Sequence, residues 1–241
     1  MHDQWDNWWD LVAPVTPPSE GLIVEFALLA PLAPADRQKV LAAARRRKFS
    51  RDAVVFWAGD PGDSVHLIAS GHVAVQINTP RGDVATVRIM GPGEHFGELA
   101  IVAPGPRSAT MRALSPLETL VIGFEDFVKL RLDPAIEGVF VEALATEIRR
   151  LSGALTDALY LSASDHLWKR LAAVEAVFSS ASEPTVLPLT QSMFATLAGV
   201  TRQTANKFLD EAESCGIVHR DARGAVTVVD RAALQERARV R

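Results

Sequence analysis

The pattern of apolar and polar positions divides the chain into stretches of different period. Between residues 54 and 122, short β-rich runs such as VHLI and HVAVQI alternate with glycine-containing turns. Strands at a spacing of about 8 to 12 residues with such turns predict an antiparallel sandwich or jelly roll. The strand–helix alternation of a doubly wound nucleotide-binding fold is absent from this stretch, so that fold is disfavoured.

A long helix is predicted after Asp133 and Pro134. Over about 26 residues, apolar positions recur at steps of three and four: Ile136, Val139, Phe140, Ala143, Leu144, Ile148, Leu151, Leu155 and Leu159. Such a helix projects past a small β-domain, and a homodimeric coiled coil is the simplest partner for its apolar seam. Ser164 and Asp165 then predict the N-cap region of another helix, which runs to Phe178.

Two segments before the β-rich stretch have patterns of their own. Residues 34–47 favour a short helix, and we expect the basic run at residues 45–48 to be the solvated end of that helix. In the first thirty residues, four apolar side chains fall on one helical face before several prolines: Trp5, Trp8, Trp9 and Val12. We expect this arm to dock on the body of the protein or on a partner subunit.

Composition limits the class of protein. The 241 residues are 48% hydrophobic, as expected for one large or two modest folded domains. No run approaches the roughly 18 to 20 apolar residues of a membrane helix, and the acidic start lacks the features of a secretory signal. The single cysteine, Cys215, excludes an internal disulfide framework and is expected to be a buried structural thiol. These features favour a cytoplasmic protein.

Charge and candidate chemistry narrow the function further. The net charge is −4, but residues 186–241 carry eight bases and six acids, which fits nucleic-acid contact through the C-terminal end. His66, His72 and His95 lack a companion ligand at a defined spacing, so neither a metal nor a haem site is expected. No nucleophile–base pair or Walker-type loop is present in the sequence, so we expect no enzyme activity.

A candidate ligand site lies in residues 93–109, which include GEHFGELA and RSA. A short helical turn near Gly97 would present free N–H groups to an anion. Arg107 can return across the loop and offer a planar fork to two phosphate oxygens. The carboxylate of Glu98 suits a sugar hydroxyl instead. The segment therefore predicts a site for a nucleotide with an exposed phosphodiester. The alternative is a turn with a surface salt bridge between Glu98 and Arg107.

Residues 189–209 predict a helix-turn-helix. Thr190 and Thr201 stand at N-cap positions of two short helices, and Gly199 lies in the turn between them. The apolar face is supplied by Phe194, Leu197, Val200, Ala205 and Phe208. Residues 216–220 and 225–229, joined by DARG, predict a wing hairpin, and a short polar helix is expected after it. The segment therefore has the parts of a winged DNA-binding domain.

The second helix of this motif exposes Arg202, Gln203 and Lys207, which lie close enough together to enter one major groove. Arginine and lysine suit the O6 and N7 acceptors of guanine, and glutamine suits the N6/N7 edge of adenine. This helix is therefore the predicted recognition helix.

With these motifs, the chain resembles the CRP/FNR family of bacterial transcription regulators over about residues 35–230. FGELA followed by RSA matches the family's phosphate-binding cassette, and five glycines match those of its cyclic-nucleotide-binding β-roll: Gly59, Gly71, Gly82, Gly93 and Gly97. The resemblance implies an α+β chain with a jelly-roll-like antiparallel β-roll. The expected domains are an arm (1–30), the β-roll (31–132), a dimerisation helix (133–162) and a winged helix-turn-helix (163–241).

The resemblance also implies roles for individual residues. Contacts to the phosphate and ribose of a cyclic nucleotide are expected from Gly97, Glu98, Leu99, Arg107 and Ser108. Glu98 would hold the 2′-hydroxyl and Arg107 the cyclic phosphate. Cyclic-AMP-dependent members hold the adenine with hydroxyl groups on the long helix, where this chain has Thr156, with Ser152 as the alternative. Ser108, in place of the threonine typical of cyclic-GMP sites, favours cyclic AMP (cAMP) over cyclic GMP.

The function implied is a homodimeric transcription regulator whose affinity for DNA is modulated by the cyclic nucleotide. The DNA is expected to be a two-fold symmetric duplex, contacted through Thr190, Thr201, Arg202, Gln203 and Lys207. Gln203 replaces a glutamate of the commonest family pattern, which leaves the operator sequence open. RNA polymerase is the expected partner if the protein is an activator. Two alternatives stand: a related regulator that binds DNA without ligand, and a nucleotide sensor that acts on a protein partner.

Overall fold

The structure is a computed structural model that describes residues 24–80, 82–179, 184–221 and 225–239. The tryptophan positions of the predicted N-terminal arm lie outside these residues. The first described segment contains a short 3-10 helix, η2 (Ala27–Leu29), whose Leu28 and Leu29 are buried. The chain therefore enters its hydrophobic core soon after residue 24.

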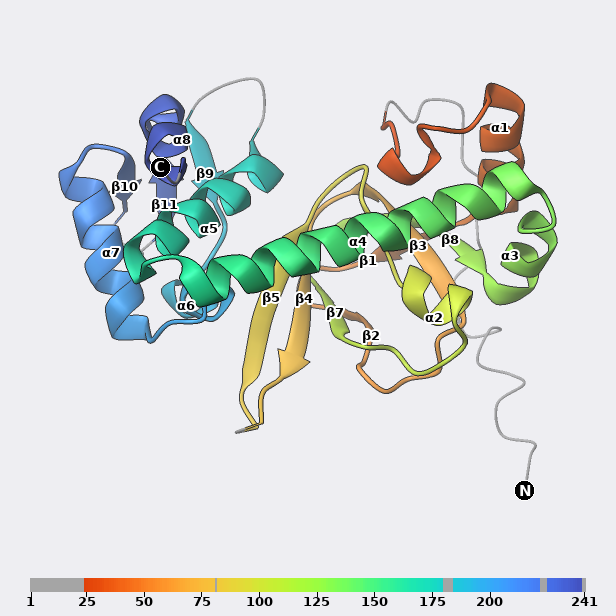
Figure 1. Cartoon of the computed structure of the whole chain (residues 1–241), viewed down its shortest axis with the longest axis horizontal. Coiled ribbons are helices and arrows are strands. Elements are labelled where there is room, and N and C mark those ends of the chain that lie inside the picture. The colour runs from red at the N-terminus through yellow and green to blue at the C-terminus, as the bar shows by residue number, and fades with distance from the viewer. Residues whose placement is uncertain (1–23, 81, 180–183, 222–224, 240–241) are drawn as a thin grey trace.

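In the described residues, eight strands form two antiparallel sheets of a β-roll (Figure 1). One sheet has the order β1 (Arg45–Phe49), β8 (Leu117–Gly123), β3 (Ser64–Ser70) and β6 (His95–Phe96). The other has the order β2 (Val54–Phe56), β7 (Thr110–Ala113), β4 (Val73–Asn78) and β5 (Val84–Met90). Residues of both sheets form one buried cluster that includes Ile68, Val73 and Phe96. The predicted antiparallel β-roll is confirmed.

The prediction of a solvated helix end at residues 45–48 is wrong. Helix α1 is Pro34–Ala43, and the basic residues that follow form strand β1, which pairs with β8. Arg46 makes an ion pair of 2.7 Å with Glu118, and the guanidinium of Arg47 lies 5.2 Å from the ring centroid of Phe49. The stems of these long side chains therefore cover the sheet while their charges find partners.

The predicted long helix is confirmed as α4 (Pro134–Tyr160), which has 27 residues. The carboxylate of Asp133 accepts a hydrogen bond from the Ala135 N–H, and a proline at the first helical position suits this start. Helix α4 runs from α3 (Phe124–Leu130) across the roll to the C-terminal domain (Figure 1).

The apolar seam of α4 divides into two parts. Ile136, Val139 and Phe140 are buried in a cluster with strands of the roll. The residues that we call the exposed seam remain open to solvent: Val141, Ile148, Leu151, Leu155 and Leu159.

The C-terminal domain packs helices on a small sheet. Helix α5 (Ala163–Phe178) begins slightly earlier than predicted, because the cap is Ser162, whose hydroxyl accepts from the Asp165 N–H at 3.1 Å. The remaining helices are α6 (Gln191–Ala198), α7 (Arg202–Ser214) and α8 (Arg231–Ala238). The wing strands β10 (Val218–Arg220) and β11 (Val226–Val228) form the predicted hairpin. A third strand, β9 (Thr185–Leu187), pairs with β11 and was not predicted.

The roll and the C-terminal domain share apolar packing. Ala74, Ile89 and Leu114 of the roll belong to the same buried cluster as the helix-turn-helix core. The backbone N–H of Thr86 donates to the Thr196 hydroxyl at 3.3 Å, which ties β5 to α6. The two domains therefore meet through a packed junction and not only through α4.

Several further expectations concern single residues and absences. Cys215 is exposed, so the prediction of a buried thiol is wrong; it follows helix α7 at the surface. Within the described ranges, no group of three or more His, Cys, Asp and Glu is placed to hold a metal ion. In the same ranges, no helix is long and apolar enough to cross a membrane.

Candidate functional site

A cavity of about 700 Å³ lies between the roll and helix α4. It is lined by five of the six residues predicted to contact a ligand: Gly97, Glu98, Leu99, Arg107 and Ser108. Its volume is typical of sites for small ligands. The structure thus brings the two halves of the cassette, FGELA and RSA, to one cavity.

Gly97 makes the close packing of the cassette possible. Its φ of 88° lies in the left-handed region, and a Cβ there would lie 2.6 Å from Nη1 of Arg107 and 2.8 Å from the Ser64 carbonyl oxygen. Only glycine avoids both the strain and the clash. Helix α2 (Glu98–Val102) begins directly after it, which places Glu98 and Leu99 at the cavity.

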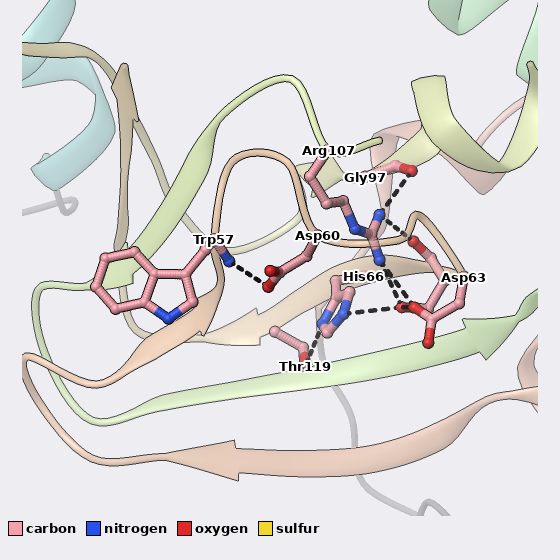
Figure 2. Close-up of polar contacts among 8 residues, drawn as sticks. Trp57, Asp60, Asp63, His66, Gly97, Arg107 and Thr119 are labelled. Carbon is pink, nitrogen blue, oxygen red and sulfur yellow. Dashed lines mark hydrogen bonds and ion pairs between the residues drawn. The ribbon is translucent and has the colours of Figure 1, made fainter. Parts of the chain in front are cut away.

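Arg107 is only 4% exposed, and protein groups hold it from several sides (Figure 2). Nη1 donates to the carbonyl oxygens of Ser64 (2.7 Å) and Gly97 (3.1 Å). Nη2 donates to the Ser64 hydroxyl (2.8 Å) and to Asp63 Oδ1 (3.1 Å). The guanidinium also lies 4.0 Å from the ring centroid of Phe56. Among the described residues, its carboxylate partner is therefore Asp63 and not Glu98.

One donor of Arg107 is left over. Nε is buried and has no hydrogen-bond partner among the described residues. An unpaired buried donor of a charged group costs free energy, and a phosphate that reached it by displacing a neighbouring group would satisfy it. The residues present therefore fit a phosphate group. The other four N–H groups of the Arg107 guanidinium already have protein partners. For the guanidinium to donate two hydrogen bonds to a phosphate, at least one of these four groups has to leave its present partner.

His66 supports this arrangement from β3. Its Nε2 lies 3.4 Å from the Ser64 hydroxyl and its Nδ1 lies 3.1 Å from the Thr119 hydroxyl. The ring stacks on Phe96 at a centroid distance of 4.8 Å. Burial, with the nearby charges of Arg107 and Arg47, holds the pKa of His66 well below its usual value. The ring is therefore a neutral histidine of the hydrophobic core.

Glu98 is half-buried in the cavity wall. Burial raises its pKa, Glu147 adds to the rise, and Arg88 and Arg107 oppose it. A partly desolvated carboxylate is a strong hydrogen-bond acceptor, which suits a sugar hydroxyl. Nearby, burial lowers the pKa of His95 to about 4, so this ring is neutral at pH 7.

The sixth predicted residue does not reach the cavity. Thr156 is exposed, and its hydroxyl donates to the Ser152 carbonyl oxygen at 3.0 Å. Instead, α4 lines the cavity with Glu142, Thr146, Glu147, Arg150 and Leu151, among others. Thr146 precedes Thr156 by ten residues, or about 15 Å along a helix. The predicted hydroxyl therefore lies too far along α4.

The helix-turn-helix has the predicted local geometry. The Thr190 hydroxyl accepts from the Met193 N–H and the Thr201 hydroxyl accepts from the Thr204 N–H, each at 3.1 Å. Gly199 ends α6 with a φ of 65°. These contacts confirm both N-caps and the turn.

The predicted DNA-contacting side chains share the exposed side of α7. Arg202, Gln203 and Lys207 are exposed, whereas Ala205 and Phe208 are buried in the domain core. A second cavity, of about 390 Å³, is lined by Thr190 and Arg202 together with Arg51 of the roll. Arg51 was not among the predicted site residues, because only the fold brings this turn beside the C-terminal domain.

Two family models match the chain. The model described as "Cyclic nucleotide-binding domain" matches residues 46–133, and the model described as "Crp-like helix-turn-helix domain" matches residues 165–237. Neither description names an enzyme class.

Relatives and solved structures agree with these matches. The chain is 30% identical over 206 residues to the "Cyclic AMP receptor protein" of Thermus thermophilus, covering 85% of this chain and 93% of that protein. It is 29% identical over 195 residues to the "CRP-like cAMP-activated global transcriptional regulator" of Mycobacterium tuberculosis, covering 79% and 87%. The crystal structure of the Thermus thermophilus catabolite activator protein matches with a TM-score of 0.51 and 28% identity, covering 88% and 97%. The chain therefore belongs to the CRP/FNR family, and it is a DNA-binding transcription regulator modulated by a cyclic nucleotide.

Proposed function

We propose that the chain acts as a homodimer whose affinity for a two-fold symmetric DNA site rises when cAMP binds in the roll cavity. The observation that carries this proposal is the dual position of helix α4. One face of α4 lines the cavity through Thr146 and Leu151, and the exposed seam runs along the same helix. A change at the cavity thus acts directly on the element that we assign to dimerisation.

In this proposal, Arg107 and Glu98 divide the ligand between them. Arg107 provides the positive charge and the free Nε–H for the cyclic phosphate, and Glu98 accepts the 2′-hydroxyl of the ribose. Gly97, Leu99 and Ser108 complete the wall around them. The names of the relatives from Thermus thermophilus and Mycobacterium tuberculosis support cAMP as the first nucleotide to test.

The dimer is proposed from the exposed seam. Leu151, Leu155 and Leu159 are each more than half exposed, and they follow one another at steps of four along α4. A second copy of the helix would bury them in a coiled coil. We assign residues 31–132 to ligand binding, 133–162 to dimerisation and 163–241 to DNA binding.

The DNA contacts are proposed for the exposed side of α7. Arg202, Gln203 and Lys207 would face base edges in the major groove, and the N-terminal ends of α6 and α7 at Thr190 and Thr201 would approach phosphates. In a dimer, two such helices about 34 Å apart match successive major grooves. Ligand binding acts as a population shift toward that spacing. We propose a cytoplasmic setting and, at activated promoters, RNA polymerase as a further partner.

The ligand half of the proposal is tested by calorimetric titration of the nucleotide-stripped protein with cAMP. We expect micromolar binding, which Arg107→Ala weakens by at least about 100-fold because the guanidinium charge and its charge-assisted hydrogen bonding to the phosphate are lost. Arg112→Ala is the matched control, because Arg112 contacts Gln76 and the Asp52 carbonyl oxygen and does not line the cavity. Loss of binding in both variants, or in neither, contradicts the assignment.

The DNA half is tested by measuring the affinity for a two-fold symmetric duplex at fixed salt, with and without cAMP. Coupling of about 5- to 150-fold is expected. Equal affinities would favour the regulator that binds DNA without ligand. Normal DNA binding by the double variant Arg202→Ala, Lys207→Ala would remove the recognition helix from the mechanism and favour a protein partner.

A further inference from the structure

Four charged side chains form a row across the cavity from the roll to α4. Arg88 on β5 donates from Nη2 to Glu94 Oε1 (2.7 Å) and from Nη1 to Glu147 Oε2 (3.0 Å). Arg150 on α4 donates to both oxygens of Glu147, at 2.7 and 2.8 Å. Glu94 is held in turn by the Gly91 N–H at 2.8 Å. The row therefore fixes Arg88 and Glu147 in place before a ligand arrives.

The row shares its cavity with the phosphate-binding cassette. Arg88, Glu94, Glu147 and Arg150 all line the cavity that Glu98 and Arg107 line. The pKa of Glu98 responds, after burial, to Glu147 and Arg88 as well as to Arg107, so this carboxylate lies within electrostatic reach of both groups. A nucleotide with its phosphate at Arg107 and its ribose at Glu98 has to place its base elsewhere in the cavity. The row and Glu142 are the charged side chains of the wall that remain for the base.

Arg88 and Glu147, the two central residues of the row, each have polar groups that can make further hydrogen bonds. Within the described residues, Glu147 Oε1 accepts one hydrogen bond, from Arg150. Arg88 uses two of its N–H groups, for Glu94 and Glu147. Both residues line the cavity, so Glu147 can offer it an acceptor and Arg88 a donor. Adenine carries a matching edge, with the N6 amino donor beside the N7 acceptor, whereas guanine presents two acceptors, O6 and N7, on the same edge.

We propose that Glu147 and Arg88 select the base of the bound nucleotide. Glu147 accepts a hydrogen bond from the adenine amino group, and Arg88 donates to the ring nitrogen beside it. A base with a carbonyl oxygen at that position is disfavoured because the oxygen faces the carboxylate. The inference rests on the proposed function and extends it: selectivity comes from a strand and helix ion pair and not from the hydroxyl of Thr156.

The test compares cAMP with cyclic inosine monophosphate, in which a carbonyl oxygen replaces the amino group. Both are titrated calorimetrically into wild type, Glu147→Gln and the control Glu142→Gln. Glu142 lines the same cavity from α4 and makes no ion pair among the described residues. We expect wild type to prefer cAMP by at least about tenfold, the scale of one hydrogen bond to a charged group.

Glu147→Gln should reduce that preference to within about threefold, because the glutamine amide can donate to the carbonyl oxygen of the inosine base. Glu142→Gln should keep the wild-type preference. Arg88→Gln should weaken both ligands by a similar factor, because N7 is common to the two bases. If Glu147→Gln does not fold, Glu147→Asp takes its place, since withdrawing the carboxylate by one methylene must also lower the preference.

The outcomes separate this inference from the function on which it rests. An unchanged preference in Glu147→Gln overturns the inference even if Arg107→Ala abolishes binding, and in that case the proposed nucleotide site stands. A purely structural role of the row would lower the melting temperature of Glu147→Gln and leave the preference unchanged, which also overturns it. Failure of wild type to bind either nucleotide overturns both proposals.

Discussion

Glu98 is a carboxylate in a setting that disfavours its charge, since burial raises its pKa. A raised pKa means that the folded state binds the proton more tightly than the unfolded chain. The stability that Glu98 contributes is therefore present at low pH and is lost as the pH rises through the raised pKa. Ligand binding has the opposite requirement, because the ionised carboxylate is the better acceptor for a ribose hydroxyl.

The affinity for cAMP is therefore expected to fall on acidification, beginning above the usual range of a glutamate pKa. Glu98→Gln should bind cAMP at least about tenfold more weakly than wild type at neutral pH. Its affinity should also depend less on pH. Calorimetric titrations between pH 7.5 and 5 measure both. His95 does not mask the effect, because its pKa of about 4 keeps it neutral over this range. A wild-type profile as flat as that of the variant would contradict the role of Glu98.

At this scale, the sequence predicts residues whose function depends on a local motif. Gly97, Glu98 and Arg107 are close in sequence, and the structure brings them to one cavity. Their supporting residues were not predictable. Asp63 holds Arg107 from another strand connection, and Glu147 approaches from α4, so no local spacing links either residue to the cassette. Thr156 was inferred from the family resemblance, which implies a hydroxyl on the long helix but does not fix which turn of α4 contacts the roll.

Among the described helices and strands, α4 carries a row of exposed large apolar side chains. Leu155 lies in the middle of the exposed seam and is 60% exposed in the single chain. A carboxylate at this position would be buried in the proposed coiled coil at a high desolvation cost. Leu155→Asp is therefore expected to raise the dimer dissociation constant by at least about 100-fold, as measured by sedimentation equilibrium.

Thr156→Asp serves as the control, because Thr156 is exposed on α4 and lies about 100° around the helix from Leu155. This variant should stay dimeric. Dissociation of both variants, or of neither, would show that the seam is not the dimer contact.

The elements differ in how far the sequence predicts them. The periodicity of α4 is internal to the helix, and its predicted start after Asp133 is confirmed. Strand β1 has no such internal pattern in its residues RRRKF. They form a strand because they pair with β8, where Glu118 makes an ion pair with Arg46. Strand β9 has only three residues, and its pairing with β11 decides its conformation. Patterns therefore predict elements that carry their own periodicity better than elements that depend on a neighbour.

At the scale of the whole molecule, the packed junction between the roll and the C-terminal domain sets the cooperativity of folding. The ring of Phe178 lies 4.3 Å from the ring of His72, and Val177 accepts a hydrogen bond from His72 at 3.3 Å. Ala74 and Ile89 extend the C-terminal core into the roll. Domains that share a core unfold together, so we expect one calorimetric transition for wild type.

Phe178→Ala is expected to loosen this junction by about 1 to 3 kcal/mol, less than a fully buried phenylalanine because the ring is half-buried. The single transition should then separate into two, with the C-terminal domain melting first. Differential scanning calorimetry distinguishes the cases. Two transitions in wild type, or an unchanged single transition in the variant, would show that the junction does not couple the domains.

Leu151 belongs both to the wall of the cavity and to the exposed seam of α4. Natural selection therefore cannot adjust the two surfaces separately at this position. A substitution at this position that reshapes the cavity for another ligand also alters the surface through which α4 is proposed to dimerise. When a gene for such a protein is duplicated, a change in the signal that one copy detects tends to separate it from the other copy as an assembly partner. The same mutation then changes the ligand that one copy detects and prevents the two gene products from forming mixed dimers.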